Sequence, residues 1–343
     1  MTARARRSDD WRRLDEADVR VRPGRGTRPR SKLRPEHADA RAAMVIWVDR
    51  GRWTCALDSD PTRIVVAMRA RELGRTPIVV GDLVELVGDT SGRPDTLARV
   101  VRVADRSSVL RRTADDNDPF ERVVVANAEQ LVIVNSLADP PPRTGFIDRS
   151  LVAAYAGGLK PLLCLTKSDL ASPDELAAAY AELSVPIIVT RRDEEPKELR
   201  EALSHKVSAL IGHSGVGKST LVNKLVPDAD RAIGEVSAVG KGRHTSVTAV
   251  ALALPGGGWV VDTPGIRSLG LAHVRPDDIV SAFPEFVEAA EECPPNCGHR
   301  GPPEDPDCML DVVTAEGAAS EGRLASLRRL LASRAGLDEY ADG

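Results

Sequence analysis

The chain has 343 residues, an ordinary globular composition apart from an aromatic content of 3%, and a formal net charge of −4 at pH 7. This length is long for one hydrophobic core and predicts two or three domains, while the nearly neutral charge neither favours nor excludes nucleic acid as a partner. No apolar run approaches the roughly 18 residues that span a bilayer, and the first residues, MTARARRSDDWRR, lack the apolar segment of a secretory signal. We therefore expect a cytoplasmic protein without membrane attachment.

Residues 1–37 are rich in arginine, glycine and proline and show no apolar periodicity. Such segments cannot bury enough apolar surface to fold alone, so we expect a disordered basic arm. Two interpretations stay open, namely a solvated tail and an arm that becomes ordered on the phosphate backbone of RNA.

Short β-type runs between residues 38 and 114 predict a barrel of about five strands, for which an oligonucleotide-binding (OB) fold is the natural candidate. The runs are Met44–Val48, Trp53–Leu57, Ile64–Met68, Ile78–Val80, Leu83–Val87 and Leu97–Val103. Arginines on or beside the expected loops suit RNA: Arg69, Arg71, Arg75, Arg106, Arg111 and Arg112. A structural barrel with ordinary surface arginines stays open, because aromatic residues for base stacking are scarce.

From a linker at Asp115–Asp118 to residue 270, strand-like and helix-like segments alternate, which predicts a mostly parallel sheet with helices on both faces. Expected strands are Leu131–Val134, Pro161–Leu165, Pro186–Val189, Val207–Ile211, Val250–Leu254 and Trp259–Val261. Expected helices are Ile147–Ala156, Pro173–Leu183, Pro196–Leu203 and Ser219–Leu225. Ligands in such sheets bind at the carboxyl ends of the strands.

A phosphate-binding loop follows the strand Val207–Ile211. Gly212, Gly217, Lys218 and Ser219 fit the pattern G-x-x-x-x-G-K-[ST], in the strand-turn-helix setting that the pattern requires. The loop amides and the helix N-terminus would hold a polyphosphate, Lys218 would reach its β- and γ-phosphates, and Ser219 would ligate Mg²⁺. The remaining residues of the expected nucleotide contact are His213, Ser214, Gly215, Val216 and Thr220.

Thr166-Lys167-Ser168-Asp169 follows the strand Pro161–Leu165 and predicts selectivity for guanine. The Asp169 carboxylate can accept hydrogen bonds from the N1–H and the amino group of guanine, donors that adenine does not offer in this arrangement. Lys167 would lie along the base. We also expect Ser208 and Ala209, at the start of the strand before the phosphate loop, to offer a backbone N–H to the guanine carbonyl.

Asp262-Thr263-Pro264-Gly265 ends the strand Trp259–Val261 and completes a GTPase set. Asp262 can hold Mg²⁺ through water, and the Gly265 N–H can sense the γ-phosphate. The order of the motifs is unusual, because in most GTPases the phosphate loop comes first and the guanine-reading loop near the end. The chain therefore resembles the ribosome small subunit-dependent GTPase A family, whose GTPase domain is circularly permuted.

This resemblance covers about residues 40–330. It implies an OB barrel at 38–114, a permuted GTPase domain at 115–270 and a helical zinc-binding domain at 271–343. It further implies a monomer that hydrolyses GTP to GDP and phosphate when the small (30S) ribosomal subunit stimulates it, and that binds ribosomal RNA late in 30S assembly.

The segment Gly240–Thr248 resembles the family's switch element. Thr245 is the first choice and Thr248 the second for the threonine that senses Mg²⁺ and the γ-phosphate. Ile266 stands where many GTPases have a water-positioning glutamine, and an isoleucine cannot orient water. By resemblance His244 takes this catalytic role with Lys218 and Thr245, although a rigidifying or RNA-contacting His244 stays open.

Four residues near the C-terminus predict a structural zinc site: Cys293, Cys297, His299 and Cys308. Their C-x₃-C-x-H-x₈-C spacing departs from the family pattern, with a closer first pair and a longer last interval. Helices are expected at 277–282, 285–292 and 324–331, and the last, which is amphipathic and basic, either contacts RNA or packs on the domain. Cys55 and Cys164 lie in apolar strands and are expected in the core.

Three rival functions remain. A GTP-dependent binding switch on another RNA or protein partner would show little hydrolysis. A small-molecule kinase would use the same phosphate loop but would not need Asp169. A structural RNA-binding module would need no Lys218.

Overall fold

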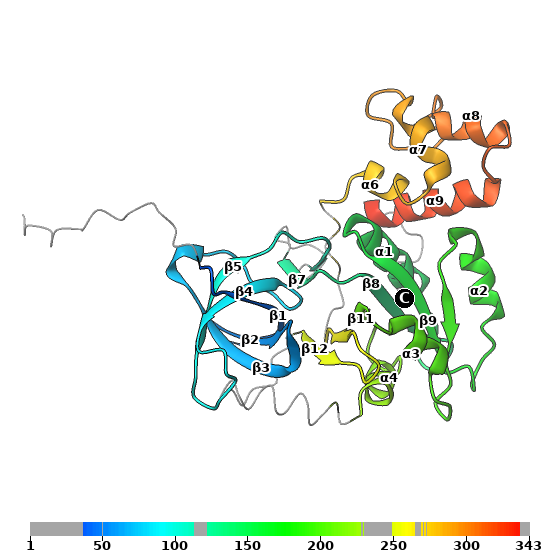
Figure 1. The fold of residues 1–343 in the computed structure, drawn as a ribbon. Coiled ribbons are helices and arrows are strands. Elements are labelled where there is room, and N and C mark those ends of the chain that lie inside the picture. Colours follow the sequence, from blue (N-terminus) through cyan, green and yellow to red (C-terminus); the bar gives the residue numbers. More distant parts are fainter. Residues whose placement is uncertain are drawn as a thin grey trace, which may run out of the picture. The chain divides into compact units, whose positions relative to one another are not determined.

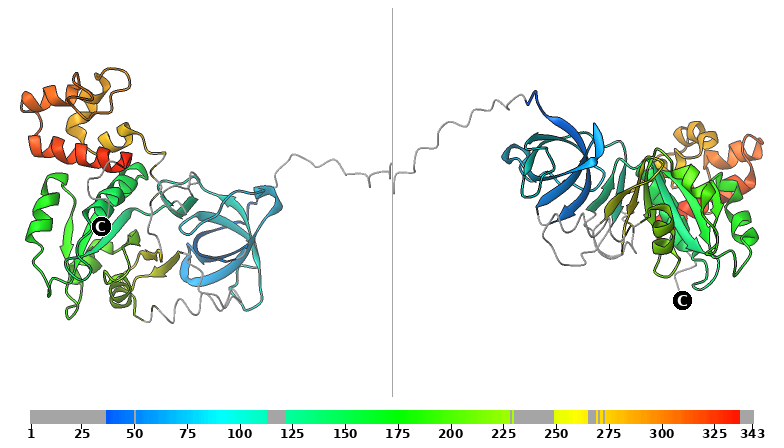
Figure 2. Two further views of the ribbon diagram at one scale, coloured as in Figure 1. Left: turned by 180° about the vertical axis from the view of Figure 1, so that it is seen from behind. Right: turned by 60° about the horizontal axis from the view of Figure 1, so that its bottom comes forward.

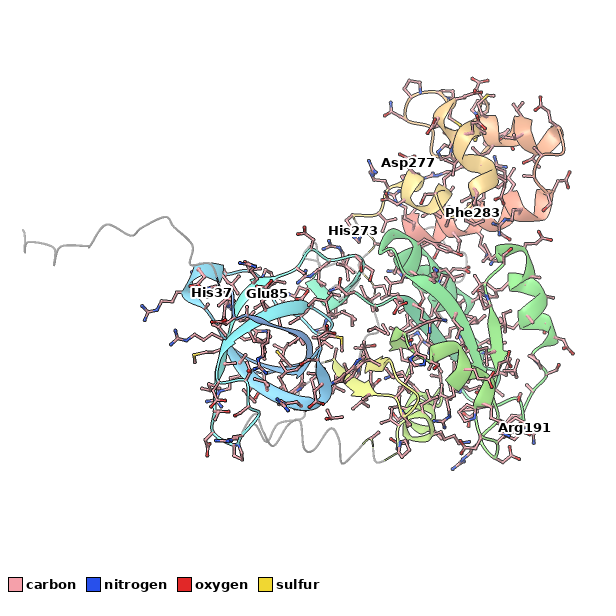
Figure 3. The ribbon with its side chains drawn as sticks, viewed as in Figure 1. His37, Glu85, Arg191, His273, Asp277 and Phe283 are labelled. Carbon is pink, nitrogen blue, oxygen red and sulfur yellow. The ribbon has the colours of Figure 1, made fainter. Side chains whose placement is uncertain are left out.

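The structure is a computed structural model that describes residues 37–49, 51–112, 122–227, 229, 249–264, 269, 271 and 273–336. Apart from His37, these residues belong to one unit, Ala38–Gly343. Figure 1 shows its elements in chain order, and Figure 3 adds the side chains. In the described part of the chain, no helix has both the length and the apolar character needed to cross a membrane.

The predicted five-stranded barrel is confirmed (Figure 1). Its strands are β1 (Arg41–Asp49), β2 (Arg52–Leu57), β3 (Asp60–Arg69), β4 (Leu83–Gly88) and β5 (Ala98–Val103). They pair in the order β1-β2-β3-β5-β4, and β4 returns to β1, so the sheet closes on itself. Alternate residues point inward, as strand geometry requires, and Val45, Cys55 and Leu86 are fully buried.

The expected strand Ile78–Val80 is wrong, because among these residues only Val80 forms a β-bridge, to Val125. The chain turns here instead, at Gly81 and Asp82. Asp82 is fully buried, and its carboxylate accepts from Arg106 Nε at 2.7 Å, which raises the pKa of the guanidinium. Arg106 therefore holds the barrel together.

Arg69 has a similar structural role. Its guanidinium donates to the carbonyls of Gly74 and Thr76 and lies 5.2 Å from the ring centre of Trp53. Arg69 and Arg106 thus both stabilise the barrel through contacts within it.

A small hairpin, absent from the sequence expectations, follows the barrel. Strands β6 (Val109–Arg112) and β7 (Arg122–Ala126) pair antiparallel. Arg111 and Arg112 thus lie in a strand. The expected linker at 115–118 lies outside the described residues. The strands on either side of this linker are short, and the second contains three consecutive valines, Val123–Val125, which have high strand propensity.

The predicted parallel sheet is also confirmed. Strands β8 (Gln130–Ser136), β9 (Lys160–Thr166), β10 (Ile187–Val189), β11 (Val207–Ile211) and β13 (Trp259–Asp262) run parallel, and β12 (Val250–Ala253) is antiparallel to β13. Their order is β10-β9-β8-β11-β13-β12. A single pair, Trp47 with Val250, joins β12 to β1 of the barrel, so the strands form one continuous sheet.

Helices cover both faces of the parallel strands, as Figure 2 shows from two further sides. The helices are α1 (Thr144–Ala156), α2 (Asp174–Tyr180), α3 (Lys197–Leu203) and α4 (Lys218–Leu225). Successive residues of a strand point to opposite faces. Accordingly Leu131 and Ile133 of β8 belong to the core with α1 and α2, whereas Val132 and Val134 belong to the core with α3 and α4.

The C-terminal segment is helical, as predicted. It contains α6 (Pro276–Val280), α7 (Pro284–Glu291), α8 (Met309–Ala315) and α9 (Glu321–Ala335). Helix α8 was not expected from the sequence, because it is short and its residues Val312, Val313 and Thr314 have low intrinsic helix propensity. Only Leu310 of this helix is buried, so its apolar pattern is weak.

The basic C-terminal helix packs on the domain, because α9 lies against α1 and buries its leucines. Its arginines also bind neighbouring elements. Arg329 Nε lies 3.1 Å from the Asp148 carboxylate on α1, and its guanidinium lies 4.8 Å from the ring centre of Tyr180. Arg323 forms an ion pair with Glu285. The helix is thus fastened to the fold on this side.

Candidate functional site

The carboxyl ends of four parallel strands bring the motifs together. The register aligns Thr166 with Ser136, and Leu210 with Asp262. The phosphate loop begins one residue after β11, between β8 and β13. Thr166, Gly212 and Asp262 therefore lie at one edge of the sheet, as sequence reasoning anticipated from their positions after strands.

The phosphate loop needs glycine at defined positions. Gly215 and Gly217 have φ of 82° and 93°, a region that residues with a Cβ rarely adopt. At Gly212 a Cβ would lie 2.7 Å from the Val134 carbonyl oxygen, so the loop passes closely over β8. Ser219 and Thr220 lie in the first turn of α4 and are exposed, so this helix N-terminus is accessible to an anion.

Lys218 and Asp262 form an ion pair at the centre of this edge. Their side chains are only 11% and 16% exposed. A partly desolvated lysine beside a carboxylate is a cation held ready for the phosphates, and the carboxylate is a hard oxygen ligand of the kind that Mg²⁺ prefers. Ser219 lies next to Lys218 in the chain, so two of the residues proposed for magnesium, Ser219 and Asp262, offer oxygen ligands in this part of the site, while the third, Thr245, lies outside the described residues.

The Thr166–Asp169 segment is anchored to the loop that begins at Gly212. The Thr166 hydroxyl donates to the Val216 carbonyl at 2.6 Å. Lys167 has φ of 62°, and its ammonium group donates to the Asp139 carbonyl. Ser168 Oγ donates to the Thr190 carbonyl at 3.3 Å, and Asp169 is exposed at the loop surface.

A cavity of about 270 Å³ lies between these loops. Its volume suits a small ligand that is partly open to solvent. Its walls are formed by Thr166, Lys167, Thr190, Arg191, Arg192, Gly215, Gly217, Thr220, Leu221 and Lys224.

Ser208 and Ala209 do not belong to this site, which corrects the sequence expectation. Both lie inside β11, paired with β8 and β13, and both are fully buried. The Ser208 hydroxyl accepts from Gln130 Nε2 at 2.8 Å. Their backbone amides are thus part of the sheet, toward the end of β11 that lies away from Gly212.

The segment after β10, and not Ser208 and Ala209, lies beside the loop that follows β9. Thr190 and Arg191 line the cavity, and Figure 3 labels Arg191. Arg191 also binds Asp193 and Glu194, which raises the pKa of its guanidinium, first through the hydrogen bond with Asp193. The signal was available in the sequence, because a strand parallel to β9 must end beside the loop that follows β9.

Several expected residues lie outside the described part of the chain. They are His244, Thr245, Thr248, Gly265 and Ile266. His213 is described, and its ring packs edge-on against Phe146 of α1 with the ring centres 4.3 Å apart.

The expected metal residues form a cluster. One ligand atom from each of Cys293, Cys297, His299 and Cys308 lies within 4.8 Å of all the others. His299 Nδ1 faces the cysteines, 3.5 Å from Cys293 Sγ and 3.9 Å from Cys308 Sγ. Three thiolates and one imidazole match a closed tetrahedral zinc site. Burial raises the pKa of Cys297 to about 12, so thiolates here need the positive charge of a metal.

The long interval between His299 and Cys308 is organised by one carboxylate. Asp305 accepts from the amides of Gly298 and Arg300 at 3.1 and 2.9 Å, and these bonds lower its pKa. The altered spacing is therefore compatible with the cluster. On the other side of the imidazole, the Asp277 carboxylate lies 3.8 Å from His299 Nε2 (Figure 3 labels Asp277).

The comparisons with known proteins agree with this geometry. The RsgA GTPase family model matches residues 103–272. The "Small ribosomal subunit biogenesis GTPase RsgA" of Alcanivorax borkumensis is 38% identical over 74% of this chain and 72% of its own. The protein of that name from Gemmatimonas aurantiaca is 37% identical over 75% of this chain and 84% of its own.

Two solved structures share the fold. The crystal structure of YjeQ from Thermotoga maritima has a TM-score of 0.63 and 26% sequence identity, and covers 87% of this chain and 99% of its own. YloQ, described as a circularly permuted GTPase, has a TM-score of 0.62 and 20% identity, and covers 89% of this chain and 99% of its own. With its barrel, its permuted strand order and its grouped motifs, this chain belongs to the RsgA GTPase family and is a GTPase.

Proposed function

We propose that this protein hydrolyses GTP when it binds the small ribosomal subunit, and that hydrolysis times its release late in subunit assembly. The ion pair between Lys218 and Asp262, at the edge where Thr166 meets the phosphate loop, carries the GTPase part of this proposal. The ribosomal part is supported by the relatives, which are named small ribosomal subunit biogenesis GTPases. Ribosomal RNA is the expected binding partner of the barrel and the C-terminal segment.

Each residue of the site has a chemical task in this proposal. Asp169 reads guanine, and Lys218 turns from Asp262 to the β- and γ-phosphates as charge develops on them. Backbone amides at Gly217 and the start of α4 hold the phosphate oxygens. Mg²⁺, held by Ser219, Thr245 and Asp262, would neutralise phosphate charge. His244 would orient the attacking water, and Gly265 would sense the γ-phosphate.

The Cys/His cluster holds a structural zinc ion in this proposal. All four ligand positions come from the protein, so no position is left for a reacting water. The site then fixes the loop between α7 and α8, and with it the surface that these helices present to a partner.

The test is GTP hydrolysis by the purified protein alone and with 30S subunits, 50S subunits or 70S ribosomes. We expect slow turnover without ribosomal particles, because Ile266 stands where a glutamine often orients water. Of the three particles, only the 30S subunit should stimulate turnover strongly. Lys218→Ala controls for contaminating GTPases in the ribosome preparation. Equal stimulation by all particles, or by none, would contradict the proposed partner.

A GTP-dependent binding switch with little hydrolysis is the alternative. It predicts tight, GTP-dependent association with a partner and turnover that the partner leaves unchanged. Measuring binding and hydrolysis on the same samples separates the two, since only a hydrolysing protein leaves the particle faster with GTP than with a non-hydrolysable analogue.

A further inference from the structure

The segment between β10 and α3 forms one wall of the nucleotide cavity and has no apolar anchor of its own. Thr190, Arg191 and Arg192 line the cavity. All residues from Arg191 to Glu195 are charged and exposed, and only Thr190 and Pro196, at the two ends of the segment, are buried. Apolar burial therefore does not fix this loop, and its conformation depends on polar contacts to its backbone.

Lys224, in the last turn of α4, makes these contacts. Its ammonium group donates to the carbonyl of Arg192 at 2.7 Å, to that of Arg191 at 3.5 Å and to that of Glu194. An ammonium group has three protons to donate and accepts none. The three carbonyls therefore use all of its protons, although the side chain also lines the cavity.

A second cation crosses the same junction in the opposite direction. Arg200 of α3 donates to the carbonyls of Lys224 and Leu225 at 2.8 and 3.1 Å. It also binds the Glu195 carboxylate at 3.2 Å. Carbonyls in the last turn of a helix have no partner within the helix, so Arg200 caps α4 from outside. Two cations thus hold the C-terminal turn of α4 and the segment after β10 together.

The restrained segment lies beside the residue that is expected to read guanine. Ser168 Oγ donates to the Thr190 carbonyl. The pKa of Arg191 is raised first by its hydrogen bond with Asp193 and, to a smaller extent, by the charge of Asp169. Since α4 begins at the phosphate loop, a segment that is fixed to α4 has a defined position relative to both ends of the nucleotide site.

We propose that Lys224 is a positioning residue for the base end of the nucleotide site. It fixes the backbone of Arg191–Glu194 before a nucleotide binds, so that a second contact to the base is already in place beside Asp169. Binding then does not have to order this loop, which would cost free energy. Lys224 acts through the loop and makes no hydrogen bond to the nucleotide. This inference rests on the proposed reading of guanine by Asp169.

The role can be measured by comparing GDP with its parts. Inhibition constants of GDP, guanosine and pyrophosphate are measured against a fluorescent GDP analogue on the full-length protein. Lys224→Met, which keeps most of the apolar stem without the charge, should weaken GDP and guanosine about ten-fold and leave pyrophosphate within about two-fold. Lys224→Arg keeps a cation with several donors and should keep GDP affinity within about three-fold. Lys224→Gln, which is also uncharged, serves if the methionine variant folds poorly.

Limited proteolysis of the nucleotide-free protein gives a second readout. Trypsin cleaves after arginine, and cleavage inside a loop requires that the loop leaves its restrained conformation. Cleavage after Arg191 and Arg192, followed by mass spectrometry, should be at least about three-fold faster in Lys224→Met. A residue that only touched the nucleotide would leave the empty loop unchanged, so equal cleavage rates would overturn the proposal.

Two further variants separate the possible outcomes. Lys206→Met removes a comparable lysine-to-carbonyl bond (2.8 Å, to Ala202) away from the cavity and should change no nucleotide constant. Asp169→Asn should weaken guanosine and GDP but not pyrophosphate; unchanged GDP affinity there would contradict the proposed base site, and this inference with it. If Asp169→Asn behaves as expected but Lys224→Met leaves guanosine unchanged, or weakens pyrophosphate as much as guanosine, the positioning role of Lys224 is overturned.

Discussion

Basic side chains serve different purposes in two regions, namely the carboxyl ends of the parallel strands, where the sequence motifs meet, and α9. Lys218 pairs with Asp262, which it can exchange for phosphate, and Arg192 lines the cavity with an exposed side chain. On α9, Arg323 and Arg329 combine ion pairs with contacts to aromatic rings and carbonyls of neighbouring elements. The role of a basic residue therefore depends more on the number and burial of the groups that it contacts than on its charge, which is what the sequence shows. Substitutions in the C-terminal segment should mainly lower stability, and substitutions at the carboxyl ends of the parallel strands should mainly lower GTP turnover.

Among substitutions in the C-terminal segment, the largest effect on stability is expected at the proposed zinc site. Cys308→Ser should abolish zinc binding, since structural zinc contributes about 10–16 kcal/mol in zinc-finger peptides and a hydroxyl is a poor substitute for thiolate. We expect loss of zinc by elemental analysis and faster hydrogen exchange in α7 and α8, with GDP affinity little changed. Cys55→Ala, a buried thiol of the barrel, should keep the zinc. Retained zinc in the Cys308 variant would contradict the assigned ligand set.

Lys218→Ala tests the activity side. Turnover with the stimulating partner should fall about 100-fold or more, because the transferring phosphoryl group loses its positioned cation. The free energy of unfolding should also fall, by about 1–3 kcal/mol, because the Asp262 carboxylate, which is 16% exposed, loses its charged partner. Lys197→Ala on the exposed surface of α3 is the control. A loss of stability without a loss of turnover would show that Lys218 serves the fold as the α9 arginines do.

Asp148→Ala breaks the fastening of α9 to α1. The change leaves Arg329 without its carboxylate; because the Arg329 side chain is 37% exposed, we expect a loss of about 2 kcal/mol rather than the full cost of breaking a buried pair. Urea unfolding measures it. Asp311→Ala breaks the pair with Arg328 and should cost less, because the Asp311 carboxylate is 35% exposed and Asp148 only 7%. If the binding free energy of GDP fell by as much as the free energy of unfolding, α9 would be linked to the nucleotide site. The two regions would then not differ in role.

Asp277→Asn probes the support of His299. A carboxylate that faces the outer nitrogen of a ligating imidazole orients the ring, and removing such a partner typically weakens metal binding at least ten-fold. Since Asp277 is 71% exposed in its side chain, we expect a change near ten-fold, measured by competition with a chelator. Glu288→Gln on the exposed surface of α7 should change nothing. Equal zinc affinity in both variants would remove Asp277 from the site.

Ser208→Ala should have the smallest effect on function. It removes one partner of Gln130 and should cost about 1 kcal/mol in the free energy of unfolding. GDP affinity should stay within two-fold, because Ser208 lies inside the sheet. A ten-fold loss of GDP affinity would restore the original expectation and contradict the assignment of the second base contact to the segment after β10.

The fold class could be predicted from the sequence because two strong patterns of apolar residues follow one another along the chain. Alternating apolar runs predicted the barrel, and alternating strands and helices predicted the parallel sheet. It missed β6, β7 and α8, which are short and have little apolar periodicity, and it added Ile78–Val80, an apolar run whose ladder is ended by the turn at Gly81. Local patterns do not show which neighbour completes a ladder.

In the site, spacing alone brought the phosphate loop, Thr166 and Asp262 to one edge and grouped the four metal residues. It failed for Ser208 and Ala209, because choosing between two strands requires knowing which strand ends lie side by side. The bond between Thr166 and Val216 joins residues 50 positions apart and follows no sequence period. Such contacts emerge only when the strand order is known.

The single backbone pair between Trp47 and Val250 has a consequence for solubility. Without β1, strand β12 would be the open edge of the parallel sheet, with unpaired amides and carbonyls beside the apolar residues Val250 and Leu252. Such edges pair readily with other chains and promote aggregation, whereas the opposite edge, β10, is protected by being three residues long. The barrel thus covers the edge strand of the GTPase sheet. A fragment that starts after the barrel would aggregate before its nucleotide chemistry could be measured.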